Sequence, residues 1–235
     1  WFCRNGVAWY LSVQAFLYAI FPPLLAVLKK ADVRRLRCIA AVIFCAQCLA
    51  SFVFWKAGLS GKAAFYLTYL CPVFRAGDFT ISCCMGCLYH SRKQESGLPG
   101  GAFSLLELAA VLLASGCLFI AARQVGVLGA VAFRYNVLFT PSAVLLVWLL
   151  AVGKGIISRL LSAKPFLWLA GLSPYGFLIH QVLIRYMEWT ADKFSFTVHP
   201  VVWTLTVYLL TLCLSSFYKA LEHRVRKRHA KAAAR

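Results

Sequence analysis

Charged residues are scarce in this chain, and acidic residues are the scarcest of them. Asp and Glu number 7 among 235 residues, against 25 Lys and Arg, and all charged residues together make up 14% of the sequence. Soluble domains carry roughly 25% charged residues, so this composition excludes an ordinary soluble domain. Apolar residues supply 62% of the chain, and the mean hydropathy is +0.76. The composition therefore predicts an integral membrane protein.

Several motifs that would carry chemistry are also missing. The sequence shows no Ser-His-Asp spacing, no glycine-rich loop for phosphates and no metal-binding motif. The net charge of +18 would suggest nucleic acid as the partner of a soluble protein. No basic stretch is interleaved with aromatic residues in a polar segment, so we predict no nucleic-acid binding.

The ten cysteines lie mostly inside apolar runs, where free cysteine behaves as a small hydrophobic residue. Helical spacing would place Cys83, Cys87 and His90 near one face, with Cys84 beside them. These residues could hold a metal, but small residues packed between helices explain them as well. We predict no metal site.

Seven apolar segments are candidates for membrane-spanning helices, which need about 20 residues each. The sequence therefore predicts an all-α, multi-pass transmembrane bundle in residues 1–222, followed by a basic cytoplasmic tail in residues 223–235. Residues 63–70 are expected to form a half-helix or an interfacial helix before the third, marginal span. The expected spans are residues 7–28, 38–55, 72–89, 103–122, 133–152, 165–187 and 200–221.

Basic residues gather on one side of these spans, mainly in residues 29–37, 92–93, 154–164 and 219–235. The positive-inside rule makes that side cytoplasmic, so the C-terminus is expected inside and Trp1 outside. An N-terminus on the outer side of the membrane, without a preceding signal peptide, is expected if this chain is the C-terminal part of a longer one.

Charged side chains within spans are costly and are candidates for function. Arg75 and Asp78 are three residues apart and can pair on one helix face. His180 follows Pro174 and Gly176, which can break the helix, and a neutral imidazole can accept a proton from a hydroxyl. A structural ion pair and a histidine bonded to a neighbouring helix are the alternatives. For Arg185 and Glu188 a structural pair is favoured. Interface anchoring explains four weaker candidates about as well as function does; these are Glu107, Arg134, Tyr135 and Asn136.

The first apolar run keeps polar residues and two prolines, which an inert anchor does not need. Its segment Trp9-Tyr-Leu-Ser-Val-Gln14 resembles the Trp-x-Leu-Ser-x-Glu...Phe-Tyr...Phe-Pro signature of the acyltransferase-3 family. Gln14 stands where the family usually has glutamate. The matching residues are Trp9, Leu11, Ser12, Tyr18, Phe21 and Pro22.

Two later segments carry the same resemblance in the same order. Arg75-Ala-Gly-Asp-Phe79 is similar to the family's Arg-x-x-Glu/Asp-Phe segment. The segment from Leu172 to Gln181 is similar to Ile-Ser-Tyr-x-x-Tyr-Leu-Ile-His-Gln. Glu222 resembles the acidic residue that closes the family's last helix. In the segment from Leu172 to Gln181, Ser173, Leu178, Ile179, His180 and Gln181 match.

The resemblance implies a multi-pass O-acyltransferase of the bacterial inner membrane. Such enzymes move an acyl group, most often acetyl from acetyl-coenzyme A, to a hydroxyl of a cell-surface or lipid-linked glycan. It also implies ten spans, of which this chain holds the C-terminal part without the family's catalytic histidine, so the fragment alone is expected to be inactive. The implied catalytic residues are His180, Arg75 and Asp78, and the implied substrate-binding residues are Trp9, Ser12, Gln14, Tyr18, Ser173 and Gln181.

Two other classes stay open. A secondary transporter would also use broken helices and charges within the membrane, although no internal repeat is visible. A non-catalytic sensing or assembly module on the same fold is the other alternative, and Gln14 in place of glutamate favours it.

Overall fold

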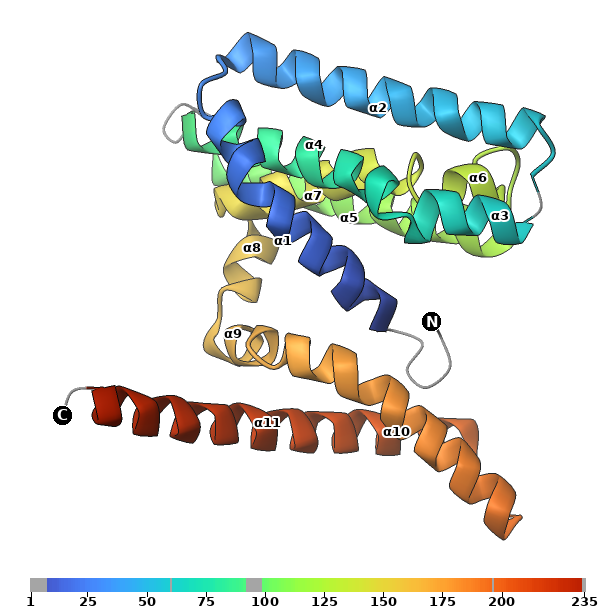
Figure 1. The fold of residues 1–235 in the computed structure, drawn as a ribbon, viewed down its shortest axis with the longest axis vertical. Coiled ribbons are helices and arrows are strands. Elements are labelled where there is room, and N and C mark those ends of the chain that lie inside the picture. Colours follow the sequence, from blue (N-terminus) through green and yellow to red (C-terminus); the bar gives the residue numbers. More distant parts are fainter. Residues whose placement is uncertain (1–7, 60, 92–98, 196, 234–235) are drawn as a thin grey trace. The chain divides into compact units, whose positions relative to one another are not determined.

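The computed structural model describes residues 8–59, 61–91, 99–195 and 197–233, and all regular structure in these ranges is helical (Figure 1). The predicted all-α class is confirmed. The long helices are α1 (Ala8–Leu28), α2 (Val33–Lys56), α4 (Pro72–Ser91), α5 (Gly100–Arg123), α7 (Phe139–Val152), α10 (Ser173–Phe194) and α11 (Pro200–Ala233). The short ones are α3 (Gly61–Phe65), the π-helix η1 (Tyr66–Leu70), α6 (Val131–Arg134), α8 (Ile156–Leu161) and α9 (Lys164–Ala170).

The helices of the described residues are consistent with a multi-pass membrane protein, but with fewer spans than the predicted seven. Five are long and apolar enough to cross a membrane, and α9 with α10 would make a sixth span, bent by 58°. The difference lies in α4, which is 20 residues long but carries Arg75, Asp78 and His90. These side chains suit the interior of a bundle better than contact with lipid.

The chain divides into two compact units, and each is described by itself. The larger unit is Ser12–Leu161, and the smaller one combines Trp1–Leu11 with Ser162–Arg235. α11 continues without a break through residues 222 and 223, where the sequence suggested that the membrane domain ends.

The core of the larger unit lies where α4 packs against its neighbours. Leu28, Leu36, Cys84 and Leu88 are buried together, and Trp148 of α7 packs against them. Asp32 caps the start of α2, because its carboxylate accepts a hydrogen bond from the backbone N–H of Arg35 at 2.7 Å. A second apolar cluster, of Phe103, Ala110 and Leu149, joins α5 to α7.

The expected short helix at residues 63–70 is present as α3 followed by η1. The π-helix ends where the backbone N–H of Cys71 donates to the carbonyl of Tyr66 at 2.9 Å. Pro72 then begins α4, at a position where its missing N–H costs no hydrogen bond. This junction points the carbonyl of Tyr69 at the side chain of Arg75.

The smaller unit is an antiparallel pair of helices, α10 and α11, preceded by α9. The expected span at residues 165–187 is broken at Gly171, because α9 ends there and Pro174 opens α10. A Cβ atom on Gly171 would overlap the ammonium group of Lys219. The side chain of Lys219 on α11 therefore packs directly against the break between α9 and α10.

Candidate functional site

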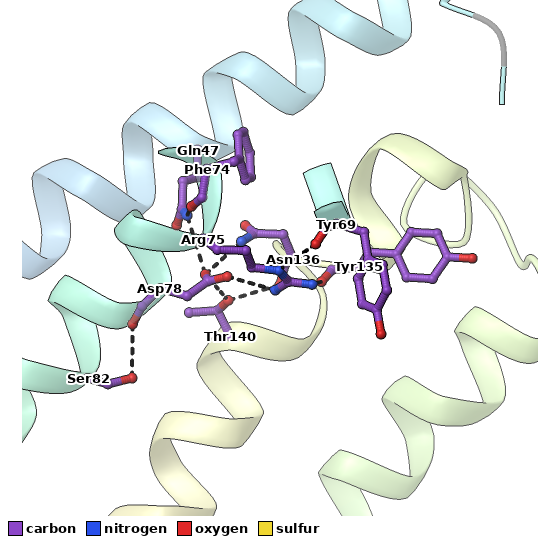
Figure 2. Close-up of polar contacts among 9 residues, drawn as sticks. All are labelled: Gln47, Tyr69, Phe74, Arg75, Asp78, Ser82, Tyr135, Asn136 and Thr140. Atoms are coloured by element: carbon purple, nitrogen blue, oxygen red, sulfur yellow. Dashed lines mark hydrogen bonds and ion pairs between the residues drawn. The ribbon is translucent and has the colours of Figure 1, made fainter. Parts of the chain in front are cut away.

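The predicted pairing of Arg75 with Asp78 is confirmed. Nη1 of Arg75 lies 2.9 Å from Oδ2 of Asp78, and the two side chains are 20% and 22% exposed (Figure 2). The pair is therefore largely withdrawn from solvent, unlike the other predicted pair. Arg185 and Glu188 have the same spacing on α10, but their side chains are 69% and 49% exposed.

Asp78 also accepts hydrogen bonds from three neutral side chains (Figure 2). Its Oδ1 receives Nδ2 of Asn136 at 2.6 Å, Oγ1 of Thr140 at 3.0 Å and Nε2 of Gln47 at 3.3 Å. These donors come from the turn after α6, from α7 and from α2. One carboxylate therefore ties three neighbouring segments to α4.

The guanidinium group of Arg75 is held on its other sides as well. Its Nε donates to the carbonyl of Tyr69 at 2.9 Å, and its Nη2 lies 3.5 Å from the carbonyl of Tyr135. Its central carbon lies 4.7 Å from the centre of the Tyr69 ring, within the range of a cation–π contact. We call Gln47, Arg75, Asp78, Asn136 and Thr140 the polar joint.

A cavity of about 370 Å³ begins at the polar joint and follows α4 and α7. Arg75, Asp78 and Thr140 lie at one end, and Tyr89 and Trp148 lie at the other. There the hydroxyl of Tyr89 donates to the carbonyl of Ala151 at 2.8 Å. A mostly apolar cavity with a few polar groups at one end is typical of small-molecule sites.

His180 lines a separate cavity, of about 300 Å³, between α10 and α11. Its Nδ1 lies 3.1 Å from the carbonyl oxygen of Gly176. A carbonyl oxygen can only accept, so this hydrogen bond requires the proton on Nδ1. In the neutral form of the ring, Nε2 is then the acceptor. Thr204, Tyr208 and Thr211 line the same cavity.

The substrate-binding residues expected from the resemblance are more dispersed. Nε2 of Gln14 donates to the hydroxyl of Tyr18 one turn later on α1, while Ser12 is exposed and Trp9 is half-buried. Ser173 is exposed at the start of α10, and half-buried Gln181 follows His180.

The structure therefore brings together Arg75 with Asp78, and Gln14 with Tyr18. His180, Ser173 and Gln181 share α10 and belong to the other unit.

Two members of the polar joint were not predicted, Gln47 and Thr140. Gln47 is 6% exposed, and a polar residue in the middle of an apolar run is a signal that could have identified it. Thr140 carries no such signal, because threonine in a helix commonly bonds to its own backbone. Here its hydroxyl also lies 3.1 Å from the carbonyl of Asn136.

Glu107 lies in the interior and does not serve as an interface anchor. Its side chain is fully buried, and its Oε2 accepts from the backbone N–H groups of Ile157 at 2.9 Å and Ser158 at 3.3 Å. The carboxylate thus satisfies two N–H groups of the first turn of α8, while the N–H of Ile156 donates to the hydroxyl of Ser104. Gly155 lies directly against it, since a Cβ there would overlap the carboxylate.

Over the described part of the chain, no group of three or more His, Cys, Asp or Glu side chains could hold a metal ion. Cys83, Cys87 and His90 instead line a cavity of about 470 Å³ together with Lys29.

Comparison with known proteins does not assign a family to this chain. No protein-family model, no curated protein and no solved structure matches this chain.

Proposed function

We propose that this chain belongs to a membrane-bound O-acyltransferase of the bacterial inner membrane, with its C-terminus in the cytoplasm. The reaction would move an acyl group, most often acetyl, from acetyl-coenzyme A to a hydroxyl of a cell-surface or lipid-linked glycan. Three segments that resemble the acyltransferase-3 family, in the family's order, support the proposal. The single observation that carries it is the placement of His180, whose Nδ1 lies 3.1 Å from the carbonyl oxygen of Gly176 and whose side chain lines a cavity.

The chemistry needs a group that holds the acceptor hydroxyl and takes up its proton as the new ester forms. The C–S bond of the thioester breaks, a C–O bond forms, and coenzyme A leaves as the thiol. Nε2 of His180 suits the acceptor side of this step, because the bond from Nδ1 to Gly176 fixes the ring and its tautomer.

Arg75 and Asp78 have a different role in this proposal. They are bonded to Tyr69, Gln47, Asn136 and Thr140, and we assign them the role of positioning residues. They hold α4 beside α2 and α7, and they keep the cavity along α4 open at its polar end.

Replacing His180 with asparagine should lower acyl transfer about 100-fold, which is within the range for loss of an acid–base group. The asparagine amide can still donate to the carbonyl of Gly176, so α10 keeps its local bond while the acceptor Nε2 is lost. Two quantities would be measured for cells that express the protein from its own gene. One is the release of free thiol from acetyl-coenzyme A, and the other is the amount of O-acetyl on the isolated glycan.

His199→Asn is the matched control. His199 precedes α11, and its Nδ1 accepts from the backbone N–H of Val201 at 3.3 Å, a role that asparagine can fill. Acylation should stay at the normal level in this variant. Undiminished acylation in His180→Asn, at normal protein levels, would remove His180 from the site.

One observation favours a carrier as the second candidate. The 58° break between α9 and α10 resembles the discontinuous helices around which transporters bind their substrates. Counterflow of a solute into proteoliposomes, without thiol release from acetyl-coenzyme A, would establish the carrier and reject the enzyme.

A further inference from the structure

A second polar cavity lies in the smaller unit, at the basic end of α11. Its volume is about 550 Å³, and its walls come from α9, the start of α10 and the last turns of α11 before residue 227. Lys219, His223 and Arg226 bring positive charge to it, and Glu222 is the acidic residue among them. The function proposed above makes no use of this cavity.

The carboxylate of Glu222 is already occupied by two partners. The hydroxyl of Tyr175 donates to its Oε2, and Nη2 of Arg226 lies 2.5 Å from its Oε1. Glu222 therefore organises Tyr175 and Arg226 around the cavity, and its carboxylate already has Arg226 as a counter-ion.

The side chain of Lys219 is half-buried beside the cavity, without an ion-pair partner among the described residues. Its ammonium group packs so closely on Gly171 that a Cβ there would overlap it. Within the described ranges no carboxylate forms an ion pair with it. A half-buried ammonium group at a cavity, with no ion pair to the one carboxylate that lines it, attracts an anion.

The surroundings of the cavity indicate which anion. On α9, next to the helix break at Gly171, the side chains of Leu167 and Trp168 are 58% and 52% exposed. α11 changes at Lys219 from an apolar helix to a basic one. A cavity that joins exposed apolar and tryptophan side chains to basic groups fits the depth of lipid head groups, where anionic lipids lie on the cytoplasmic side.

We propose that this cavity is a binding site for one anionic phospholipid, whose phosphate contacts Lys219 and whose upper acyl chain lies against Trp168. Arg226 and His223 stand at the outer rim, where they attract the head group. A soluble phosphate would gain nothing from the exposed apolar side chains of α9, so the lipid is the better fit.

The test measures lipid retention by native mass spectrometry of the whole protein, purified in detergent with phosphatidylglycerol or phosphatidylcholine. Phosphatidylglycerol should be retained in preference to phosphatidylcholine. Lys219→Gln should lower its retention about fivefold, as expected for one basic residue at a membrane surface. Lys219→Arg should keep most of the preference, because the positive charge remains.

Lys227→Gln is the matched control, since it removes the same charge two turns later on α11 without lining the cavity. An equal loss in this variant would mean non-specific attraction to the basic segment and would overturn the site. Equal retention of the two lipids by the unmodified protein would also overturn it, whatever the folding of the variants. If inorganic phosphate in phosphatidylcholine micelles displaced phosphatidylglycerol completely, the ligand would be a free phosphate. None of these readouts depends on acyl transfer.

Discussion

Asp78→Ala should lower the free energy of unfolding by about 3 kcal/mol, as expected when one partner of a largely buried ion pair is removed. The substitution leaves Arg75 without its counter-ion and also leaves the amides of Asn136 and Gln47 and the hydroxyl of Thr140 without their shared acceptor. The loss would be measured as a lower unfolding midpoint of the purified protein in detergent, by heat or by denaturing detergent.

Glu188→Ala provides the comparison, because Arg185 and Glu188 have the same spacing and the same kind of helix. Their side chains are 69% and 49% exposed, so the pair should contribute less than about 0.5 kcal/mol. If the two variants lost similar amounts of unfolding free energy, Asp78 would contribute no more to stability than an exposed surface ion pair does. The polar joint would then have no structural role.

The pairing of Arg75 with Asp78 could be predicted because it depends only on helical spacing. The rest of the polar joint depends on which helices become neighbours. Gln47 is 31 residues from Asp78 in the sequence, and Thr140 is 62 residues from it. Helical spacing predicts contacts only between residues a few positions apart, so neither contact could be predicted from it. Apolar runs show where helices form, but they do not show which faces meet.

The fold follows the same division between local and distant interactions. The helical segments could be located because about 20 apolar residues between turns are a local signal. The bend at Gly171 was suggested only by Pro174 and Gly176, three and five residues later. In the structure the break lies at Gly171, where the ammonium group of Lys219 packs from across the helix pair. A contact of this kind is invisible until the pairing of α10 with α11 is known.

The burial of Glu107 could not be predicted from its position in an apolar segment. Its position near the end of an apolar run leaves a functional role and an interface anchor open, whereas the structure buries its side chain completely. The reason is that α8 begins beside α5, and its first backbone N–H groups need acceptors that no solvent supplies.

Gly155→Ala should destabilise the larger unit by about 2 kcal/mol, within the range for forcing an extra carbon into a packed interior. The new Cβ would overlap the carboxylate of Glu107. That carboxylate cannot move away without releasing the N–H groups of Ile157 and Ser158. The unfolding midpoint of the purified protein would report the loss.

Gly116→Ala is the control for this change, since Gly116 lies within α5 and a Cβ there would meet nothing within 4 Å. It should stabilise the helix by about 0.5–1 kcal/mol. The double variant Gly155→Ala with Glu107→Asp tests the cause, because the shorter side chain withdraws the carboxylate from the new methyl group. Its loss should be smaller than the sum of the two single losses. Strict additivity would mean that Gly155 is constrained by something other than Glu107.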